Sequence, residues 1–157
     1  MLTLTRTTSN NPDFQNLIVL LDQDLKVKDG DDHAFYAQFN KVDSIKEVIV
    51  AYINGVAAGC GAIKPYIQTI AEVKRMFVHP DFRRQGIAKQ VLAALEAWAK
   101  ELNYSATILE TGMKQADAIE LYKNNGYTVI PNYGQYAGVE NSVCMQKALL
   151  TSDLAHR

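Results

Sequence analysis

The chain has 157 residues, 48% of them hydrophobic and 21% charged, and this composition predicts one folded domain over 1–157 and excludes a disordered protein. Its 16 basic residues nearly balance its 17 acidic ones, for a net charge of −1, which argues against a nucleic-acid partner because phosphate binding needs a basic excess. Two cysteines without metal-ligand spacing favour a reducing compartment and give no reason to expect a metal.

The first half of the sequence predicts a strand, two helices and three more strands. Residues 2–7 alternate as a strand does, and Asn11-Pro12 begins a helix whose apolar residues recur at helical spacing. A second, short helix is expected over 31–40. Further strands are predicted over 47–53, 56–67 and 69–78. Asn54-Gly55 predicts a type I′ hairpin turn between the first two of these, because both central positions of that turn need positive φ.

The second half predicts helices over 86–102 and 116–125 and short strands over 106–110, 128–130 and 143–148. Because a helix carries the chain back between strands 69–78 and 106–110, we expect these two strands to be parallel. The order predicts a mixed α/β fold, with a mostly antiparallel central sheet, one parallel pair and about four flanking helices. No apolar run is long enough for a signal peptide or a membrane span, so we expect a cytoplasmic protein without a membrane partner.

A basic loop precedes the helix that begins at Gly86. The first amides of a helix have no partner inside it and form the positive end of its dipole. Gly86 removes a side chain where a ligand would approach, and Arg83 and Arg84 add charge, so the loop is suited to a diphosphate. The alternative is a basic loop whose glycine serves packing. The sequence lacks the spacing of a Walker phosphate loop and of a dinucleotide fingerprint.

Two motifs in register resemble the GNAT superfamily of acyl-CoA N-acetyltransferases. Arg83-Arg84-Gln85-Gly86-Ile87-Ala88 is similar to the Arg/Gln-x-x-Gly-x-Gly/Ala signature, and Ala118-Ile119-Glu120-Leu121-Tyr122 followed by Gly126-Tyr127 is similar to a second family element. The order of elements matches that family from residue 2 to about 147. The resemblance implies a GNAT-like fold whose parallel strands splay apart, and acetyl-CoA as the co-substrate.

The resemblance also implies which residues bind coenzyme A. The pyrophosphate would be held by the signature loop, namely Arg83, Arg84, Gln85, Gly86, Ile87 and Ala88. The preceding strand would carry a bulge and pair with the pantetheine arm through the backbone of Met76, Phe77 and Val78, and one nearby amide would bind the thioester oxygen. Gln115 matches a position that contacts the cofactor. Core packing is the alternative for the side chains of Met76 and Phe77.

The reaction implied is direct attack of a neutral amine on the thioester, which needs a base for the amine and an acid for the thiolate. Tyr122 is the candidate acid, with simple packing as the alternative. Glu72 is the first candidate base, as in histone-acetylating members, unless it pairs with a neighbouring cation such as Arg75. Glu110 is the second candidate, as base or as binder of the substrate ammonium, unless it pairs with Lys114.

A polar and aromatic loop over 131–138 is the expected wall of the acceptor pocket. Tyr133 and Tyr136 would enclose a small amine, and Asn132 and Gln135 would orient a carboxylate or amide. A surface loop or a homodimer contact is the alternative. We expect transfer to a small-molecule primary amine, such as an amino acid or polyamine. A protein lysine or N-terminus is the alternative within the enzyme class, and a non-catalytic acyl-CoA sensor is the alternative from another class.

Overall fold

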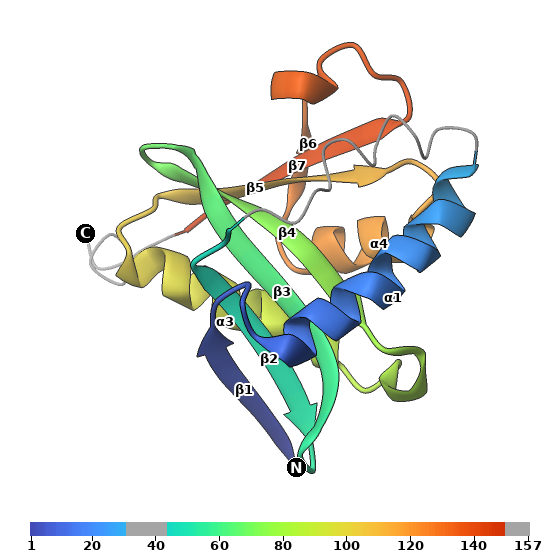
Figure 1. The fold of residues 1–157 in the computed structure, drawn as a ribbon. Helices are drawn as coiled ribbons and strands as arrows, with labels where there is room; N and C mark the ends of the chain where they lie inside the picture. Colours follow the sequence, from blue (N-terminus) through green and yellow to red (C-terminus); the bar gives the residue numbers. More distant parts are fainter. Residues whose placement is uncertain (31–43, 150–157) are drawn as a thin grey trace. The chain divides into compact units, whose positions relative to one another are not determined.

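The computed structural model of the chain describes residues 1–30 and 44–149 (Figure 1), and the helix expected over 31–40 lies outside them. The described residues form seven strands and three α-helices. The sheet order is β1-β2-β3-β4-β5-β7-β6. β4 and β5 are parallel, whereas β1–β2, β2–β3, β5–β7 and β6–β7 are antiparallel. The predicted mixed sheet with one parallel pair is confirmed.

The strands are β1 (Leu2–Thr7), β2 (Glu47–Ile53), β3 (Val56–Ile67), β4 (Ile70–Val78), β5 (Ala106–Gly112), β6 (Thr128–Ile130) and β7 (Ser142–Ala148). The α-helices are α1 (Pro12–Asp29), α3 (Ile87–Glu101) and α4 (Ala116–Asn124). The predicted boundaries of these elements are correct to within one or two residues. The largest difference is at β5, which continues past its predicted end to Gly112 because β7 still pairs with it there. None of the described helices is long and apolar enough to cross a membrane.

The chain divides into two compact units, and each is described by itself. Unit 1 comprises Met1–Lys64 and Lys74–Leu95, and unit 2 comprises Pro65–Val73 and Glu96–Arg157. Strand β4 and helix α3 each contribute residues to both units. The boundary between the units falls within β4, between Val73 and Lys74.

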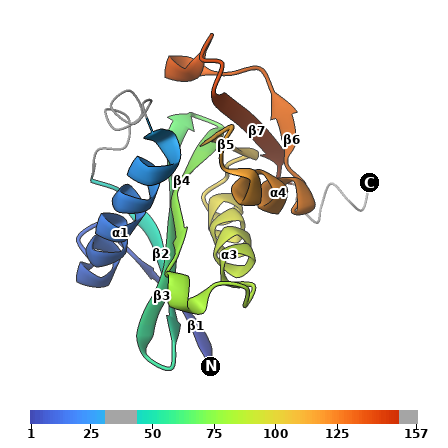
Figure 2. The same ribbon diagram turned by 90° about the vertical axis from the view of Figure 1, so that its right-hand side faces the viewer.

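Unit 1 has helices on both faces of its strands (Figure 2). Helix α1 begins where the Asn11 side chain accepts a hydrogen bond from Phe14 N at 3.1 Å. Its apolar residues form a core cluster with one face of β2 and β3. On the other face Gly61 has no side chain, and a Cβ there would lie 2.9 Å from atoms of Val91 and Leu95 of α3. This glycine therefore lets α3 pack directly on the sheet.

The hairpin between β2 and β3 has the predicted turn. Asn54 and Gly55 have φ values of 50° and 84°, which is the left-handed conformation that a type I′ turn requires. A Cβ built on Gly55 would meet no atom within 4 Å. The glycine is therefore required by the backbone conformation and not by crowding.

Unit 2 is built on β5, which pairs with the first residues of β4 on one side and with β7 on the other. Glu72 of β4 is in register with Ile108, and Glu110 is in register with Cys144 of β7. Cys60 of unit 1 and Cys144 are both free and buried, as the sequence predicts.

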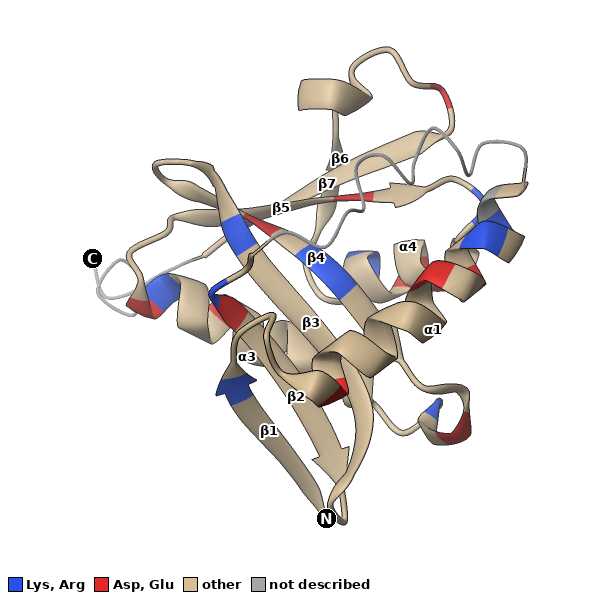
Figure 3. Cartoon of the chain, in the orientation of Figure 1, with Lys and Arg blue, Asp and Glu red and all other residues tan. Residues whose placement is uncertain are grey.

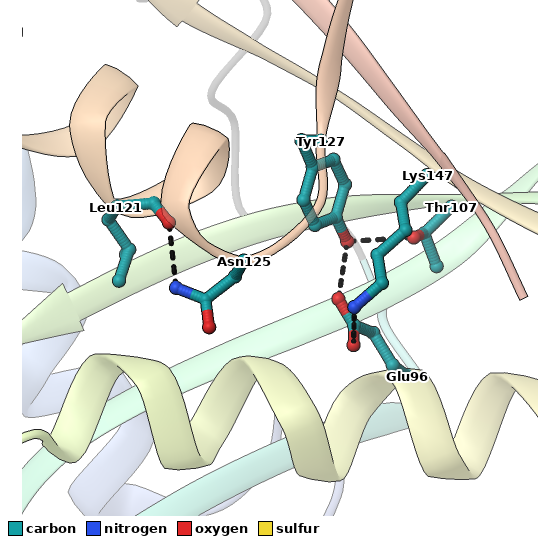
Figure 4. Close-up of polar contacts among 6 residues, drawn as sticks. All are labelled: Glu96, Thr107, Leu121, Asn125, Tyr127 and Lys147. Atoms are coloured by element: carbon teal, nitrogen blue, oxygen red, sulfur yellow. Dashed lines mark hydrogen bonds and ion pairs between the residues drawn. The ribbon is translucent and has the colours of Figure 1, made fainter.

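A polar network fixes the end of α3 to the strands of unit 2 (Figure 4). The Tyr127 hydroxyl donates to Glu96 Oε2 at 2.9 Å and lies 2.7 Å from Thr107 Oγ1. Lys147 Nζ donates to Glu96 Oε1 at 2.9 Å. Tyr127 is buried and its hydroxyl is satisfied, so this second tyrosine of the family element supports the fold.

Candidate active site

The signature loop of unit 1 connects β4 to α3 through a short 3-10 turn, Pro80–Phe82. His79 caps that turn, because its Nδ1 accepts from Asp81 N at 3.1 Å. Two left-handed residues follow, Arg84 with φ 65° and Gly86 with φ 75°, and α3 begins at the next residue. Glycine adopts this conformation without the steric cost that a Cβ carries, so Gly86 suits the loop geometry.

The space beside Gly86 is open, and a Cβ built there would meet no atom within 4 Å. Within the described residues, the Gln90 amide donates to Gly86 O at 3.2 Å and closes the first turn of the helix. The amides that precede Gln90 lie in the first turn, where helix geometry gives them no partner inside the helix. An open position lined by backbone donors fits the oxygens of a diphosphate.

The Arg83 side chain is fixed beside the end of β4. Its Nε donates to Val78 O at 3.0 Å, and its guanidinium carbon lies 5.6 Å from the centre of the Phe77 ring. Its Nη2 lies 4.0 Å from Asp24 Oδ2. Arg83 therefore uses one acceptor site of the Val78 carbonyl, a group that the resemblance assigns to pantetheine.

The strand that precedes the loop contains a backbone irregularity at Arg75, whose φ is 61°. This left-handed residue inside β4 is of the kind found at bulges. The Phe77 side chain belongs to the α1 core cluster, and the Met76 sulfur would lie 2.5 Å from a Cβ on Gly61. Both side chains serve packing, the alternative that the sequence left open for them.

Sequence reasoning missed the role of Arg75. Its side chain is 4% exposed and its Nη1 lies 3.2 Å from Asp22 Oδ1 of α1. Among the described residues its Nη2 has no hydrogen-bond partner. Arg75 therefore pairs with Asp22, so among the cations that the sequence offered to Glu72 Arg75 is not the partner. A buried arginine next to a lysine in a strand carries no motif that would have indicated this pairing.

Unit 2 brings Glu72 together with three tyrosines, and we call this group, with Glu110, the carboxylate–tyrosine cluster. The Tyr133 hydroxyl donates to Glu72 Oε2 at 2.6 Å. The Tyr133 ring packs edge-on against Tyr66 at 4.9 Å and Tyr136 at 5.7 Å between ring centres. Glu72 is 7% exposed and Tyr136 is 3% exposed. The side chains that the sequence places on β4 and on a distant loop therefore form one group, in which Tyr133 is half-buried and Tyr66 is exposed.

The charges of both carboxylates act on the same side chains. Burial raises the pKa of the Tyr136 hydroxyl, and the charges of Glu110 and Glu72 raise it further. Burial likewise raises the pKa of the Cys144 thiol, with smaller contributions from the same two carboxylates. Burial, and then the charge of Glu72 and its hydrogen bond, raise the pKa of Tyr133. These hydroxyls and the thiol are therefore protonated at neutral pH.

Tyr122 is buried in unit 2, near Glu110. Among the described residues its hydroxyl has no hydrogen-bond partner. Its ring packs edge-on against Tyr127, with 5.7 Å between centres. Burial, and secondly the charge of Glu110, raise the pKa of its hydroxyl, which stays protonated at neutral pH.

Gln115 lies just before α4, where its backbone amide donates to Gly112 O at 3.0 Å and its side chain makes no capping bond.

The loop over 131–138 turns its aromatic residues inward. The prediction that its Asn132 orients a substrate carboxylate or amide needs correction. Asn132 Nδ2 donates to Val139 O at 2.8 Å and to Ser142 O at 3.1 Å. Both amide hydrogens therefore hold the loop together, and a substrate carboxylate is not their partner. The homodimer contact of this loop stays a prediction.

Comparison with known proteins supports one family. A sequence model described as the acetyltransferase (GNAT) family matches residues 14–127. A curated relative named IAA acetyltransferase, from Azospirillum brasilense, is 39% identical over 104 residues, which cover 64% of this chain and 67% of the relative. The match thus spans about two thirds of each chain.

Solved structures agree with that match. A crystal structure from Klebsiella pneumoniae subsp. pneumoniae, assigned to the acyl-CoA N-acyltransferases, has a TM-score of 0.77 and 33% identity, and covers 96% of this chain and 99% of its own. A structure of a GNAT family acetyltransferase from Elizabethkingia anophelis with acetyl-CoA bound has a TM-score of 0.66 at 19% identity, and covers 94% and 98% of the two chains. The second likeness concerns the fold alone.

Proposed function

Because this chain belongs to the acetyltransferase (GNAT) family, we propose that it transfers the acetyl group of acetyl-CoA to a primary amine of a small molecule in a ternary complex. The observation that carries this proposal is Glu72, a buried carboxylate whose described partner is a tyrosine hydroxyl. Such a group can take a proton from an amine. A sensor that only binds acyl-CoA needs no base of this kind.

The residues of unit 1 fit the diphosphate of coenzyme A. The amides of residues 84–88 would bind its oxygens, and Arg83 and Arg84 would balance its charge. When bound, acetyl-CoA supplies an acyl group on a thioester that an amine can attack. The acetyl-CoA present in the Elizabethkingia anophelis protein is consistent with this assignment.

Glu72 is the proposed base. Tyr133 bonds to Oε2 of its carboxylate, which fixes the carboxylate orientation and leaves Oε1 for the substrate. A substrate ammonium would lose a proton to Glu72, and its nitrogen would then attack the thioester carbonyl carbon. The carbon–nitrogen bond forms and the carbon–sulfur bond breaks. The sulfur leaves as a thiolate and takes up the second proton that the nitrogen loses as the amide forms, so that coenzyme A is released as the free thiol. Glu110 would hold the ammonium or serve as a second base.

Tyr122 is the proposed acid, acting as a hydrogen-bond donor to the leaving sulfur. Its raised pKa keeps the proton on the phenol before the reaction. An ordinary thiol has a pKa of about 8.5, well below that of a phenol, so complete transfer of the proton would be uphill. Donation of a hydrogen bond to the developing thiolate lowers its energy without that cost.

The burial of Glu72 and Tyr136 favours a small acceptor over a protein lysine or N-terminus, because a narrow amine reaches a buried carboxylate with less rearrangement. The first test is a panel of amines mixed with acetyl-CoA, with free thiol as the readout. We expect amine-dependent thiol release. Tight binding of acetyl-CoA with no release for any amine would support the sensor.

Glu72→Gln tests the base. We expect a fall in kcat/KM of about 10²-fold, most marked at low pH, where more of the amine carries the proton that must be removed. Glu140→Gln, an exposed position in unit 2, is the matched control and should not change the rate. A pH–rate profile identical to that of the unsubstituted chain would remove Glu72 from the mechanism.

A further inference from the structure

We propose that the acceptor is an aliphatic amine with no carboxylate next to its amino group, so that a diamine is used in preference to the amino acid with the same carbon skeleton. This inference rests on the proposed function, and it concerns the carboxylate–tyrosine cluster of unit 2. The sequence predicts a small amine acceptor and does not distinguish an amino acid from a polyamine, whereas this inference favours the polyamine class.

The first observation is that Glu72 has no ion-pair partner among the residues that the structure describes. Glu72 lies on β4 and Glu110 on β5, and Figure 3 shows acidic positions on both strands. Glu72 is 7% exposed, its described contact is the Tyr133 hydroxyl, and it forms no ion pair with any residue that the structure describes. A buried carboxylate is stable when a cation compensates it. A substrate ammonium would supply that cation.

The second observation is the aromatic surroundings of Glu72. Tyr66, Tyr133 and Tyr136 pack edge-on in a row, with 4.9 and 5.7 Å between successive ring centres. Tyrosine rings attract ammonium groups through their faces and also cover methylene chains. A row of such rings beside a carboxylate therefore suits an aliphatic ammonium ion.

The third observation is that the charges of Glu72 and Glu110 act on the other side chains of the cluster. The pKa values of Tyr136 and Cys144 are raised by burial and then by the charges of both Glu72 and Glu110. A substrate carboxylate placed among these groups would be repelled by both. Of the two loop amides predicted to orient a carboxylate, Asn132 uses its Nδ2 for Val139 O and Ser142 O, and Gln135 is exposed. The two carboxylates thus favour positive charge, and the Asn132 amide provides no partner for negative charge.

Matched pairs of amines test the proposal. Putrescine is compared with ornithine, and cadaverine with free lysine, since each pair differs only by the carboxylate. Calorimetric titration of each amine into the protein saturated with coenzyme A gives the Kd of that amine. Thiol release from acetyl-CoA gives its kcat/KM. We expect each diamine to be favoured by at least about tenfold in both measurements. The methyl ester of lysine should recover affinity relative to lysine, because it has no free carboxylate.

Substitutions in the cluster test whether its residues cause the preference for diamines over amino acids. Glu72→Gln should move the Kd ratio of cadaverine to lysine toward one, because it removes one of the two charges that repel the carboxylate of lysine. Glu140→Gln should keep the ratio of the unsubstituted chain. Thermal unfolding of both variants in the presence of coenzyme A reports whether Glu72→Gln has folded. Tyr133→Phe, which keeps the ring, is a second probe and should weaken the discrimination.

The outcomes separate this inference from the proposed function. Amino acids that bind and react as well as the diamines, or better, would overturn the inference and leave the acetyltransferase intact. Diamines that bind preferentially without any thiol release would support the acceptor class and overturn the proposed transfer. Absence of both binding and release for every amine would overturn both.

Discussion

The signature loop of unit 1 and the carboxylate–tyrosine cluster of unit 2 are built on opposite principles. The loop is exposed from Arg83 to Gly86, and its proposed ligand contacts come from the main chain. The cluster has Glu72 and Tyr136 buried at its centre and uses side-chain oxygens and rings. In the loop a side chain matters mainly by being absent, as at Gly86. In the cluster each side chain matters by its own chemistry.

This difference determines how each region responds to substitution. A backbone site fails when something is added to it, because an added side chain occupies the ligand's place. A buried side-chain site fails when something is removed from it, because the remaining polar groups lose their partners. The substitutions below use this contrast, and each has a control matched in conformation or exposure.

Gly86→Glu should produce the largest effect, a loss of coenzyme A affinity of more than about 10²-fold, because it places a carboxylate where the diphosphate would bind. Gly55→Glu is the control, since Gly55 also has positive φ and open space for a Cβ in the same unit. Both variants carry similar backbone strain. Calorimetric titration with coenzyme A should show the loss in Gly86→Glu alone. Equal affinities would place the diphosphate elsewhere.

Tyr122→Phe should lower kcat by about 10²-fold with little change in the Kd of acetyl-CoA, because it removes a proton donor and keeps the ring. Tyr104→Phe, at a half-buried position of unit 2, is the control and should retain kcat. Steady-state kinetics with free-thiol detection measures both. An unaltered kcat in Tyr122→Phe would mean that this buried tyrosine serves packing only.

Asp22→Ala should destabilise the chain by about 2 kcal/mol, because it leaves Arg75 buried without a partner. The estimate lies below the usual range for a buried pair, since the Asp22 side chain is 47% exposed. Asp24→Ala is the control on the same helix, where the pair with Lys28 is more exposed and contributes about 0.5 kcal/mol or less. Urea unfolding measures both, and equal losses would show that Arg75 is solvated.

The fold and the loop were predictable because their signals are local. The positive φ values at Asn54 and Gly55 follow from one dipeptide, and the signature loop is six consecutive residues. The parallel pairing of β4 and β5 follows from the crossover helix between them. These features depend on neighbours in the sequence, and the structure agrees with the predictions made for them.

The cluster was predictable only in part, because its members come from distant positions. Tyr133 and Glu72 are 61 residues apart and were predicted separately, as a substrate contact and a base, but not as a bonded pair. Nothing in the sequence around Tyr66 indicates that its ring packs against Tyr133. The assignment of Asn132 failed because the bonds that occupy its amide depend on how the loop folds back on Val139 and Ser142.

The smallest predicted effect concerns the network of Tyr127 in unit 2. Burial, and then the charge of Glu96, raise the pKa of the Tyr127 hydroxyl above that of a free phenol, about 10. The stabilisation from this hydroxyl is therefore complete below about pH 10 and is lost as the pH rises further, because the unfolded state then releases the proton first. Tyr127→Phe should reduce the free energy of unfolding by about 1 kcal/mol at neutral pH, through loss of the bonds to Glu96 and Thr107.

The same variant should show a shallower decline of stability above pH 10 than the unsubstituted chain. Urea unfolding across alkaline pH, with tyrosinate absorbance as a second signal, measures this slope. In unit 1 burial raises the pKa of the Cys60 thiol to about 12, so Cys60→Ala should instead change the slope from about pH 9, where a free thiol begins to ionise. If Tyr127→Phe and the unsubstituted chain declined in parallel, the Tyr127 hydroxyl would have to be exposed to water, contrary to the network in Figure 4.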